Sequence, residues 1–552
     1  MTLSFESARA KAGWRLLLAW LLLNALLLTP ELPWAGFPPH HWLALEAPLL
    51  IGLLLLLPPS RLRRWACAAV ALIGVTIALG ALGDGLMQAM QGRSINLYTD
   101  VSLLPILIEL LVANLGLPLT LALTCGLGLA LFAVGWALTA LLAASHRPPL
   151  PRGLGVVLLA VGAGGLALQY AGRLESTPIG SPALGFVTFE WQRALETRNA
   201  LAAFGGELQS DPGARALPGL AGTDVVLGFI ESYGVAAIER EPFADEIRPR
   251  LAQVQAELAA AGLSMVTGRV TASTLGGQSW LNHATLLSGL PITSQLRFEL
   301  MLNRHHSTLV DDFAASDHRT LAVMPGIIRD WPEGRQLGYD EIHTADSLGY
   351  RGPPMGWASM PDQFTWKRVG DYLDAAAAST NATTPASRAT FAELATLSSH
   401  APWSPVITLV DWNRVGDGEV FSRWAGAGDD YASLWQNTEA MRAHYAPAID
   451  YALQAAAGFA ERQVGKHTLM LILGDHQAAP SIIGPSPGKD VPLHVISGDP
   501  ALLEGFLHNG FRPGALPPGP EQAIPMSQIR ALLHRIYTAA PALSRPAAAH
   551  GS

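Results

Sequence analysis

Cysteine and charge are both scarce in this sequence of 552 residues. It has two cysteines, Cys67 and Cys125, and 14% of its residues are charged, whereas 50% are hydrophobic. Both cysteines fall in long apolar segments, so the rest of the chain must take its stability from its core and from any bound metal, without disulfides. A chain this long and this apolar is not one ordinary soluble domain. Part of it must therefore lie in lipid.

Several common sequence signatures are also missing. The run Gly-Gly-Gln-Ser at residues 276–279 lacks the lysine and the spacing of a phosphate-binding loop, and no dinucleotide fingerprint occurs. The formal net charge is −8 and no basic run lies outside the apolar half, so we expect no nucleic-acid partner. We find no internal repeats. Residues 374–390 and the tail after Pro541 have the composition of flexible segments.

Hydrophobic residues are concentrated before about residue 172, where we predict a bundle of five membrane spans. The predicted spans are residues 14–34, 42–58, 65–83, 117–144 and 153–171. The segment 103–112 is apolar but interrupted by Pro105 and Glu109, so we expect it along the outer membrane interface. A cleaved signal peptide is the alternative for the first segment, but no small-residue cleavage site follows it.

Positive charges gather on one side of these predicted spans. The basic residues before span one, between spans two and three, and between spans four and five are Arg9, Lys11, Arg15, Arg61, Arg63, Arg64, Arg147 and Arg152. The opposite loops carry only Arg93. Because positive loops stay in the cytoplasm, the N-terminus is expected inside and, after five crossings, the C-terminal part outside the cytoplasmic membrane.

The C-terminal part alternates short β-prone runs with helical patterns. Predicted strands are residues 224–230, 264–270, 319–324, 390–397, 405–410, 468–473 and 491–496, and predicted helices are 185–204, 243–262 and 437–462. This alternation predicts an α/β domain with a mostly parallel sheet sandwiched by helices. The expected organisation is a transmembrane domain (1–172), a linker with one helix (173–220), an α/β domain (221–540) and a disordered tail (541–552).

Candidate metal ligands follow two of the predicted strands. Glu231 ends the apolar run 225–230, and Asp475 and His476 end the run 469–474. In an open α/β sheet, ligands gather outside the carboxyl ends of the strands, so these side chains can converge on one metal ion. Taken singly, Glu231 is better interpreted as a loop carboxylate, and Asp475 and His476 as turn residues.

Ser279 lies where a Gly-rich turn gives way to a segment of helical period. A hydroxyl in the first turn of a helix faces unpaired N–H groups and the positive end of the helix dipole, which stabilise an alkoxide or a phosphoryl group. The alternative is that Ser279 is an ordinary helix N-cap. His283 lies four residues further on and so on the same helical face, where it contacts either substrate or structure.

Five short blocks in order resemble the membrane-anchored branch of the alkaline-phosphatase/sulfatase superfamily, with lipoteichoic acid synthases and periplasmic phosphoglycerol transferases as the nearest likeness. The blocks are Glu231-Ser232-Tyr233, Gly277-Gln278-Ser279, residues 397–402, Gly474-Asp475-His476 and Asp490-Val491-Pro492. The resemblance spans about residues 220–500. It implies an alkaline-phosphatase/sulfatase-like fold and one divalent ion, Mn²⁺ in preference to Mg²⁺ or Zn²⁺.

The resemblance also implies roles for single residues. Glu231, Asp475, His476 and the oxygen of Ser279 would hold the ion, and Ser279 would be the nucleophile. His400 would contact the substrate or hand a proton to a leaving alkoxide. Trp331 and Arg335 loosely match a Trp and an Arg that bind the head group in lipoteichoic acid synthases, although the spacing differs.

Some features depart from the family pattern. The nucleophile of lipoteichoic acid synthases is usually Thr, and residues 280–283 do not follow the synthase sequence, which leaves the substrate open. The formylglycine signature of sulfatases is missing, which disfavours sulfate esters. The cysteine-free outer part also disfavours the phosphoethanolamine transferases, whose outer domains usually carry several disulfides.

We therefore expect a metal-dependent phosphotransferase at the outer face of the cytoplasmic membrane. It would move a phosphoglycerol-like head group from a membrane phospholipid, through a covalent Ser279 intermediate, to a glycan or glycolipid acceptor. One alternative is a phosphate- or sulfate-ester hydrolase of the same superfamily. A second is a non-catalytic membrane protein with a sulfatase-like domain, against which the intact Glu, Ser and Asp-His set speaks.

Overall fold

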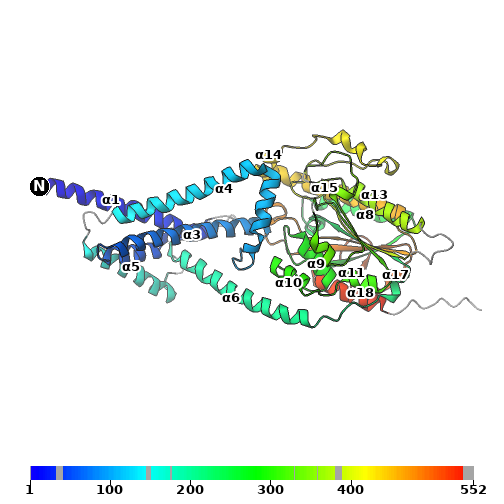
Figure 1. Ribbon diagram of the computed structural model, residues 1–552, viewed down its shortest axis with the longest axis horizontal. Coiled ribbons are helices and arrows are strands. Elements are labelled where there is room, and N and C mark those ends of the chain that lie inside the picture. Colours follow the sequence, from blue (N-terminus) through cyan, green and yellow to red (C-terminus); the bar gives the residue numbers. More distant parts are fainter. Residues whose placement is uncertain are drawn as a thin grey trace, which may run out of the picture. The chain divides into compact units, whose positions relative to one another are not determined.

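The computed structural model describes residues 2–32, 41–91, 93–144, 151–174, 177–328, 330–356, 358–378 and 388–538. The chain forms two compact units, Met1–Ala89 with Arg93–Ala202, and Met90–Gly92 with Ala203–Ser552 (Figure 1). Arg147, residues 379–387 of the predicted flexible stretch and the tail from 541 lie outside the described residues.

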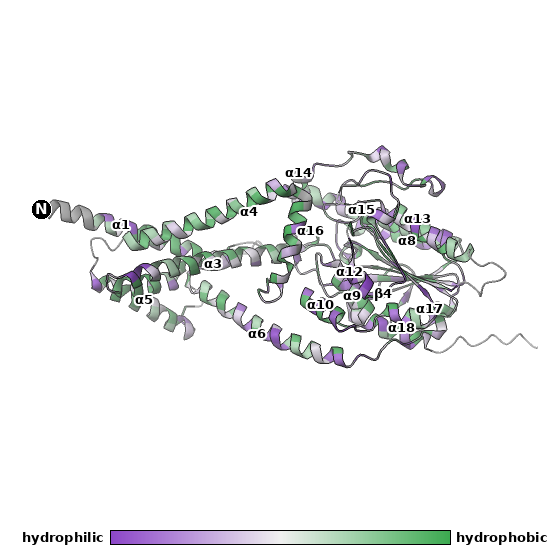
Figure 2. Ribbon diagram, in the orientation of Figure 1, coloured by the Kyte–Doolittle hydropathy of each residue, from purple (hydrophilic) through white to green (hydrophobic). Residues whose placement is uncertain are grey.

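Among its described residues, the first unit contains four helices that are long and apolar enough to cross a membrane. They are α1 (Thr2–Leu27), α3 (Arg61–Gln91), the Leu115–Ala144 part of α4 (Leu104–Ala144), and α5 (Arg152–Tyr170). Hydrophobic residues cover much of their length (Figure 2), and large ones such as Trp14, Leu72 and Phe132 are exposed, as in helices that face lipid. The chain thus has an apolar helical unit suited to a membrane.

The predicted second span corresponds to α2 (Glu46–Leu56), which has only 11 residues. This is shorter than the roughly 20 residues that a crossing needs, so the predicted count of five spans stays a prediction. Glycines bring α2 and α5 close together. A Cβ on Gly52 would lie 2.5 Å from the backbone N of Leu159, and one on Gly162 would lie 2.7 Å from that of Leu49. Small residues at such an interface let two backbones pack closely.

The long helix α4 is two helices joined at a kink. Gly116 has φ 74° and ψ 156°, a conformation that glycine adopts without strain, and Pro118 follows two residues later. The kink separates the apolar segment 104–115, which includes the predicted interfacial piece, from the long apolar helix that follows it.

The second unit is built on one mixed sheet of nine strands. Its path is β10 (Arg512–Pro513), β4 (Ser264–Thr271), β9 (Asp490–Ser497), β8 (Thr468–Gly474), β3 (Asp224–Ile230), β7 (Thr390–Ala395), β5 (Arg319–Met324) and β6 (Glu341–Thr344), with β11 (Ile524–Pro525) paired to β4. The five strands from β8 to β6 are parallel, whereas β10, β4, β9 and β8 pair antiparallel in succession. The sheet is therefore mixed, with a parallel portion around β3.

Helices cover both faces of this sheet (Figure 1). The buried hydrophobic residues of this unit form two cores. The first core includes residues of α8 (Ala244–Ala260), α13 (Asp362–Ala378) and α15 (Thr438–Gln463). The second core includes residues of α9 (Ser279–Ser288), α10 (Gln295–Asn303), α11 (Leu309–Ala315), α17 (Ala501–Leu507) and α18 (Ile529–Tyr537). Along β3, Val226 faces the first core while Val225 and Leu227 face the second. Burial on both faces explains why this strand reads as an unbroken apolar run.

Two sequence predictions in this unit need correction. Residues 405–410 form no strand, because the long-range partner of this backbone is a side chain. Gln363 on α13 donates to the carbonyl of Val410 at 2.7 Å and accepts from its N–H at 3.0 Å. The prediction also missed β6, and it placed flexible chain from residue 374, although α13 continues to Ala378.

Candidate active site

Two neighbouring parallel strands bring the acidic candidates together. Ile230 at the end of β3 is in register with Gly474 at the end of β8, so Glu231 and Asp475 emerge at the same sheet edge. The N–H of Asp475 donates to the carbonyl of Ile230 at 3.2 Å. A Cβ on Gly474 would lie 1.8 Å from the carbonyl oxygen of Tyr233, so only glycine fits at this crossing.

Ser279 reaches the same edge from β4. Because β4 is antiparallel to β9 and β9 is antiparallel to β8, β4 runs in the same direction as β8 and ends at the same edge. The chain then turns back through residues 272–278 into α9. Asn282 holds that turn, since its Oδ1 accepts from the N–H groups of Ser273 and Thr274 at 2.8 and 3.2 Å.

Ser279 is the first residue of α9 and not its N-cap. Gln278 occupies the cap position in the left-handed conformation, with φ 63° and ψ 44°, and makes no side-chain cap bond. The Ser279 hydroxyl instead lies 3.0 Å from Oε2 of Glu231 and 3.2 Å from Nε2 of His476. Its contacts are therefore with the candidate metal ligands.

Glu231, Asp475 and His476 form a compact, buried donor set. One ligand atom from each residue lies within 4.8 Å of the others. His476 Nε2 is 3.3 Å from Oε1 of Glu231 and 3.7 Å from Oδ2 of Asp475. Two carboxylates and an imidazole, with the Ser279 hydroxyl beside them, suit Mn²⁺, Mg²⁺ or Zn²⁺. The chemistry of the residues present thus fits one divalent ion.

Neighbouring groups fix the orientation of these donors. Asp475 Oδ1 accepts from the N–H groups of Ser232 and His476 at 2.8 and 2.6 Å, which leaves Oδ2 toward His476. His476 Nδ1 lies 2.8 Å from the carbonyl oxygen of Gln477. A carbonyl only accepts, so Nδ1 carries the hydrogen and a neutral ring presents the lone pair of Nε2 to the cluster.

Burial and like charge shift the pKa values of this cluster. Burial raises the pKa of Asp475 to about 7, and the negative charge of Glu231 contributes to the rise. Burial alone would lower the pKa of His476, but Asp475 and Glu231 outweigh it and raise this pKa to about 9. Burial alone would raise the pKa of Glu231, yet His476 holds it well below its usual range. The cluster therefore attracts positive charge.

His400 lies on a turn tied to Glu231. Ser399 donates its hydroxyl to the carbonyl of Glu231 at 2.7 Å, and Trp403 donates its indole N–H to the carbonyl of Ser399 at 2.6 Å. His400 Nδ1 lies 2.7 Å from the carbonyl oxygen of Ala401. The charge of His400 contributes to lowering the pKa of Glu231, which places the imidazole near the metal ligands. A small pocket beside it is lined in part by Val406.

Three predicted substrate residues make other contacts. His283 Nδ1 lies 2.8 Å from Oε1 of the buried Glu393, and its ring stacks on Phe229 with centroids 3.7 Å apart. Trp331 stacks on Tyr339, and Arg335 forms an exposed ion pair with Asp330. Among the described residues, no hydrogen bond or ion pair joins these three to the Ser279 cluster. Their role in binding substrate stays a prediction.

Sequence reasoning missed the supporting residues Ser232, Asn282, Ser399 and Gln477. All four are next to a residue already singled out, and adjacency alone gave no reason to assign them a role. Asn282 did carry a signal, because it is an amide within a largely apolar segment of helical period. In the structure it is fully buried, and a buried amide requires hydrogen-bond partners.

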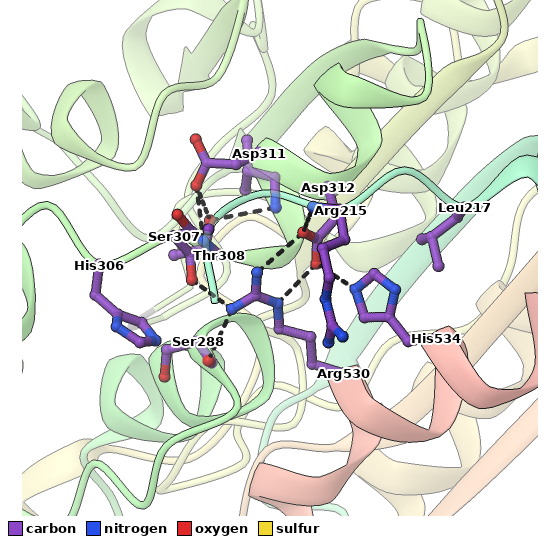
Figure 3. Close-up of polar contacts among 12 residues, drawn as sticks. Arg215, Leu217, Ser288, His306, Ser307, Thr308, Asp311, Asp312, Arg530 and His534 are labelled. Carbon is purple, nitrogen blue, oxygen red and sulfur yellow. Dashed lines mark hydrogen bonds and ion pairs between the residues drawn. The ribbon is translucent and has the colours of Figure 1, made fainter. Parts of the chain in front are cut away.

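A buried charge cluster holds the far end of α9 (Figure 3). Arg530 on α18 donates from Nε and Nη2 to the two carboxylate oxygens of Asp312 on α11, at 2.6 and 2.9 Å. His534 Nε2 lies 2.8 Å from the same carboxylate. Arg530 also donates to the carbonyl of Ser288, the last residue of α9, at 3.2 Å. The helix that begins at Ser279 is thus fixed at both ends.

Comparison with known proteins gives weak structural likenesses. No family model and no curated protein matches the chain. Among solved structures, the lipoteichoic acid synthase LtaP from Listeria monocytogenes is 12% identical over 60% of this chain and 77% of its own, with a TM-score of 0.37. The phosphoglycerol transferase GacH from Streptococcus pyogenes, solved with sn-glycerol-1-phosphate, is 11% identical over 61% and 79%, also with a TM-score of 0.37.

A protein of the alkaline phosphatase superfamily from Vibrio parahaemolyticus is 13% identical over 59% of this chain and 67% of its own, with a TM-score of 0.35. These are the kinds of protein that the sequence blocks resemble. Likenesses this weak carry no function over to this chain, whose chemistry is argued from the geometry around Ser279.

Metal binding should depend on the three buried donors. Replacing Asp475 and His476 together by Ala, or Glu231 alone, should weaken binding of Mn²⁺ by orders of magnitude, because each variant removes charged or imidazole ligands from a small set. Bound metal in the purified full-length protein measures this. His444→Ala is the matched control, since among the described residues the ion-pair partner of His444 is Asp429, an exposed residue outside the donor set. Stoichiometric metal in the double variant would show that the site is wrong.

Affinity for the metal should rise with pH. His476, with a raised pKa of about 9, and Asp475, with a raised pKa of about 7, hold protons at pH 6 that an ion must displace. Between pH 6 and 8 the dissociation constant should therefore fall by up to about tenfold per pH unit for each proton displaced. Titration of Mn²⁺ into metal-free protein at three pH values tests this, and a constant affinity would contradict it.

Proposed function

We propose that this protein is a membrane-anchored phosphotransferase with Ser279 as its nucleophile. The observation that carries the proposal is the position of the Ser279 hydroxyl at the first turn of α9, 3.0 Å from Glu231 and 3.2 Å from His476. A hydroxyl beside a buried metal-ligand set and at a helix N-terminus is suited to attack on a phosphoryl group. The side-chain oxygen of an N-cap serine would instead accept hydrogen bonds from backbone amides.

The chain's own residues define the first half of the reaction. Glu231 accepts a hydrogen bond from the Ser279 hydroxyl and orients it, and the first N–H groups of α9 face the phosphoryl oxygens. Glu231, Asp475 and His476 would hold a divalent ion, which would supply Lewis-acid activation and offset the charge on phosphorus. The Ser279 hydroxyl gives its proton to water, and its oxygen attacks phosphorus to form an Oγ–P bond. The P–O bond to the lipid alcohol breaks, and His400 donates a proton to the leaving oxygen.

The second half reverses these roles. An acceptor hydroxyl gives its proton to His400 and attacks phosphorus, and Ser279 is released. We propose a phospholipid head group, phosphoglycerol-like, as the group transferred and a glycan or glycolipid as the acceptor. An apolar helical unit in the same chain supports a donor of this kind, because it keeps the site near a lipid that does not leave the bilayer. We propose Mn²⁺ as the ion.

Turnover with and without an acceptor separates a transferase from a hydrolase, and substitutions at Ser279 test whether it is the nucleophile. A transferase keeps water from the covalent intermediate, so a soluble phosphodiester analogue should give one fast turnover and then a stall that an acceptor relieves. Ser279→Ala should abolish both phases, whereas Ser279→Thr should retain activity because it keeps the hydroxyl. The mass of the adduct trapped on Ser279 after incubation with membrane lipids identifies the transferred group.

Each of three other outcomes would contradict a different part of this proposal. Fast turnover that needs no acceptor would replace the transferase by a hydrolase. Absence of any first turnover from metal-loaded protein on every phosphodiester or sulfate ester tried would favour a non-catalytic role. Full activity of Ser279→Ala would show that another group is the nucleophile.

The proposed reaction requires the second unit outside the cytoplasmic membrane. A reporter that is active only outside the cytoplasm should work when fused after Leu220 and fail when fused after Arg64, because the basic residues favour a cytoplasmic N-terminus and five predicted spans would take the chain to the other side. The reverse pattern in cells expressing the two fusions would contradict an outer-leaflet substrate.

A further inference from the structure

Helix α6 (Pro182–Gln209) carries an exposed apolar stripe that the proposed chemistry does not use. Leu184, Val187, Trp191 and Leu195 are spaced by three or four residues and so share one helical face. Their side chains are 48%, 48%, 67% and 43% exposed. Four large hydrophobic residues in one row are more than the scattered exposure of an ordinary surface.

The opposite face of α6 is fixed to the first unit. Arg193 donates to the carbonyls of Ile95 and Ser94, at 2.5 and 3.2 Å, and Asn96 donates its side-chain amide to the hydroxyl of Thr197 at 2.7 Å. Nearer the helix start, the ring of Phe186 packs against Gly80 of α3. The orientation of α6 within this unit is therefore set, and its apolar stripe points away from the helices it packs on.

Charge placement divides α6 in the same way. Glu190 is buried on the packed side, while Gln192 and Glu196 flank the stripe and are exposed. No charged residue lies within the stripe between Leu184 and Leu195. With its charged residues α6 is not among the helices apolar enough to cross a membrane, and Figure 2 shows polar and apolar residues alternating along it. This is the composition of an amphipathic helix that has one side suited to lipid.

We propose that the stripe of Leu184, Val187, Trp191 and Leu195 contacts lipid, where α6 runs beside the end of α3 and leaves the membrane that its own unit spans. Two observations select lipid as the occupant. The first turn of α6 is joined to the membrane unit, since the N–H of Leu184 donates to Glu46 of α2 at 2.9 Å. The central stripe residue is tryptophan, which prefers the interface. Arg198, exposed one turn beyond Leu195, can reach lipid phosphate.

This inference is independent of the chemistry at Ser279. It concerns the segment that leads into the second unit, since residues 203–209 of the same helix belong to that unit.

Spin labels on the full-length protein test the proposal. Cys125→Ser removes the exposed native cysteine, whereas Cys67 is buried and stays unlabelled. Nitroxides are then placed by Leu184→Cys, Trp191→Cys or Leu195→Cys, with Gln192→Cys and Glu196→Cys as matched controls on the same helix. The protein is reconstituted in vesicles of phosphatidylcholine and phosphatidylglycerol. Collision rates with oxygen, which concentrates in lipid, and with a water-soluble nickel chelate are measured.

The stripe positions should show an oxygen-to-nickel collision ratio several-fold higher than the two controls. Equal ratios at all five positions would mean that the stripe faces water and would overturn the proposal. Low collision rates with both reagents, with broadened spectra, would mean that protein covers the stripe and would overturn it as well. A benzophenone amino acid at position 191 or 196, with both cysteines retained, gives the same contrast as cross-linking to lipid.

Discussion

Two buried carboxylates that repel each other are the constraint around which the second unit is arranged. Glu231 and Asp475 lie at the ends of adjacent strands with little water to screen them, and such a pair is stable only with a positive partner. His476 provides part of that charge. Its Nδ1–H donates to the backbone carbonyl of Gln477. The surrounding N–H groups satisfy one oxygen of Asp475 and leave the other toward the cluster. The need for a cation is thus built into the fold itself.

The sequence predicts much of this arrangement because buried parallel strands have a recognisable pattern. The runs that became β3, β5 and β8 are short and apolar, and the polar residues that follow β3 and β8 were expected at one edge of the sheet. The position of Ser279 at this edge was harder to predict from the sequence. It depends on β4 and β8 running in the same direction, which follows because each pairs antiparallel with β9. It also depends on the left-handed backbone conformation of Gln278, which no local sequence pattern requires.

Other features depend on partners far away in the chain. Residues 405–410 have the composition of a strand, but Gln363 hydrogen-bonds to Val410 from a helix 47 residues earlier. His283 shares a helical face with Ser279, and helical spacing alone left a substrate role open while slightly favouring a structural one. Its contact with Glu393 follows from the position of β7 beside β3. Local propensity contains none of this information, so such errors are expected where a side chain replaces a backbone partner.

The fit of Gly474 against the carbonyl of Tyr233 has a consequence for how such chains diverge. At 1.8 Å from backbone, even a single methyl group has no room, and no neighbouring side chain is available to rotate away. Ligand residues can exchange Asp for Glu or Ser for Thr while keeping their donor atoms, but this position has no conservative alternative. A lineage that abandoned metal binding would be free to change its donors one by one, yet it would still retain this glycine for as long as the two strands stayed side by side.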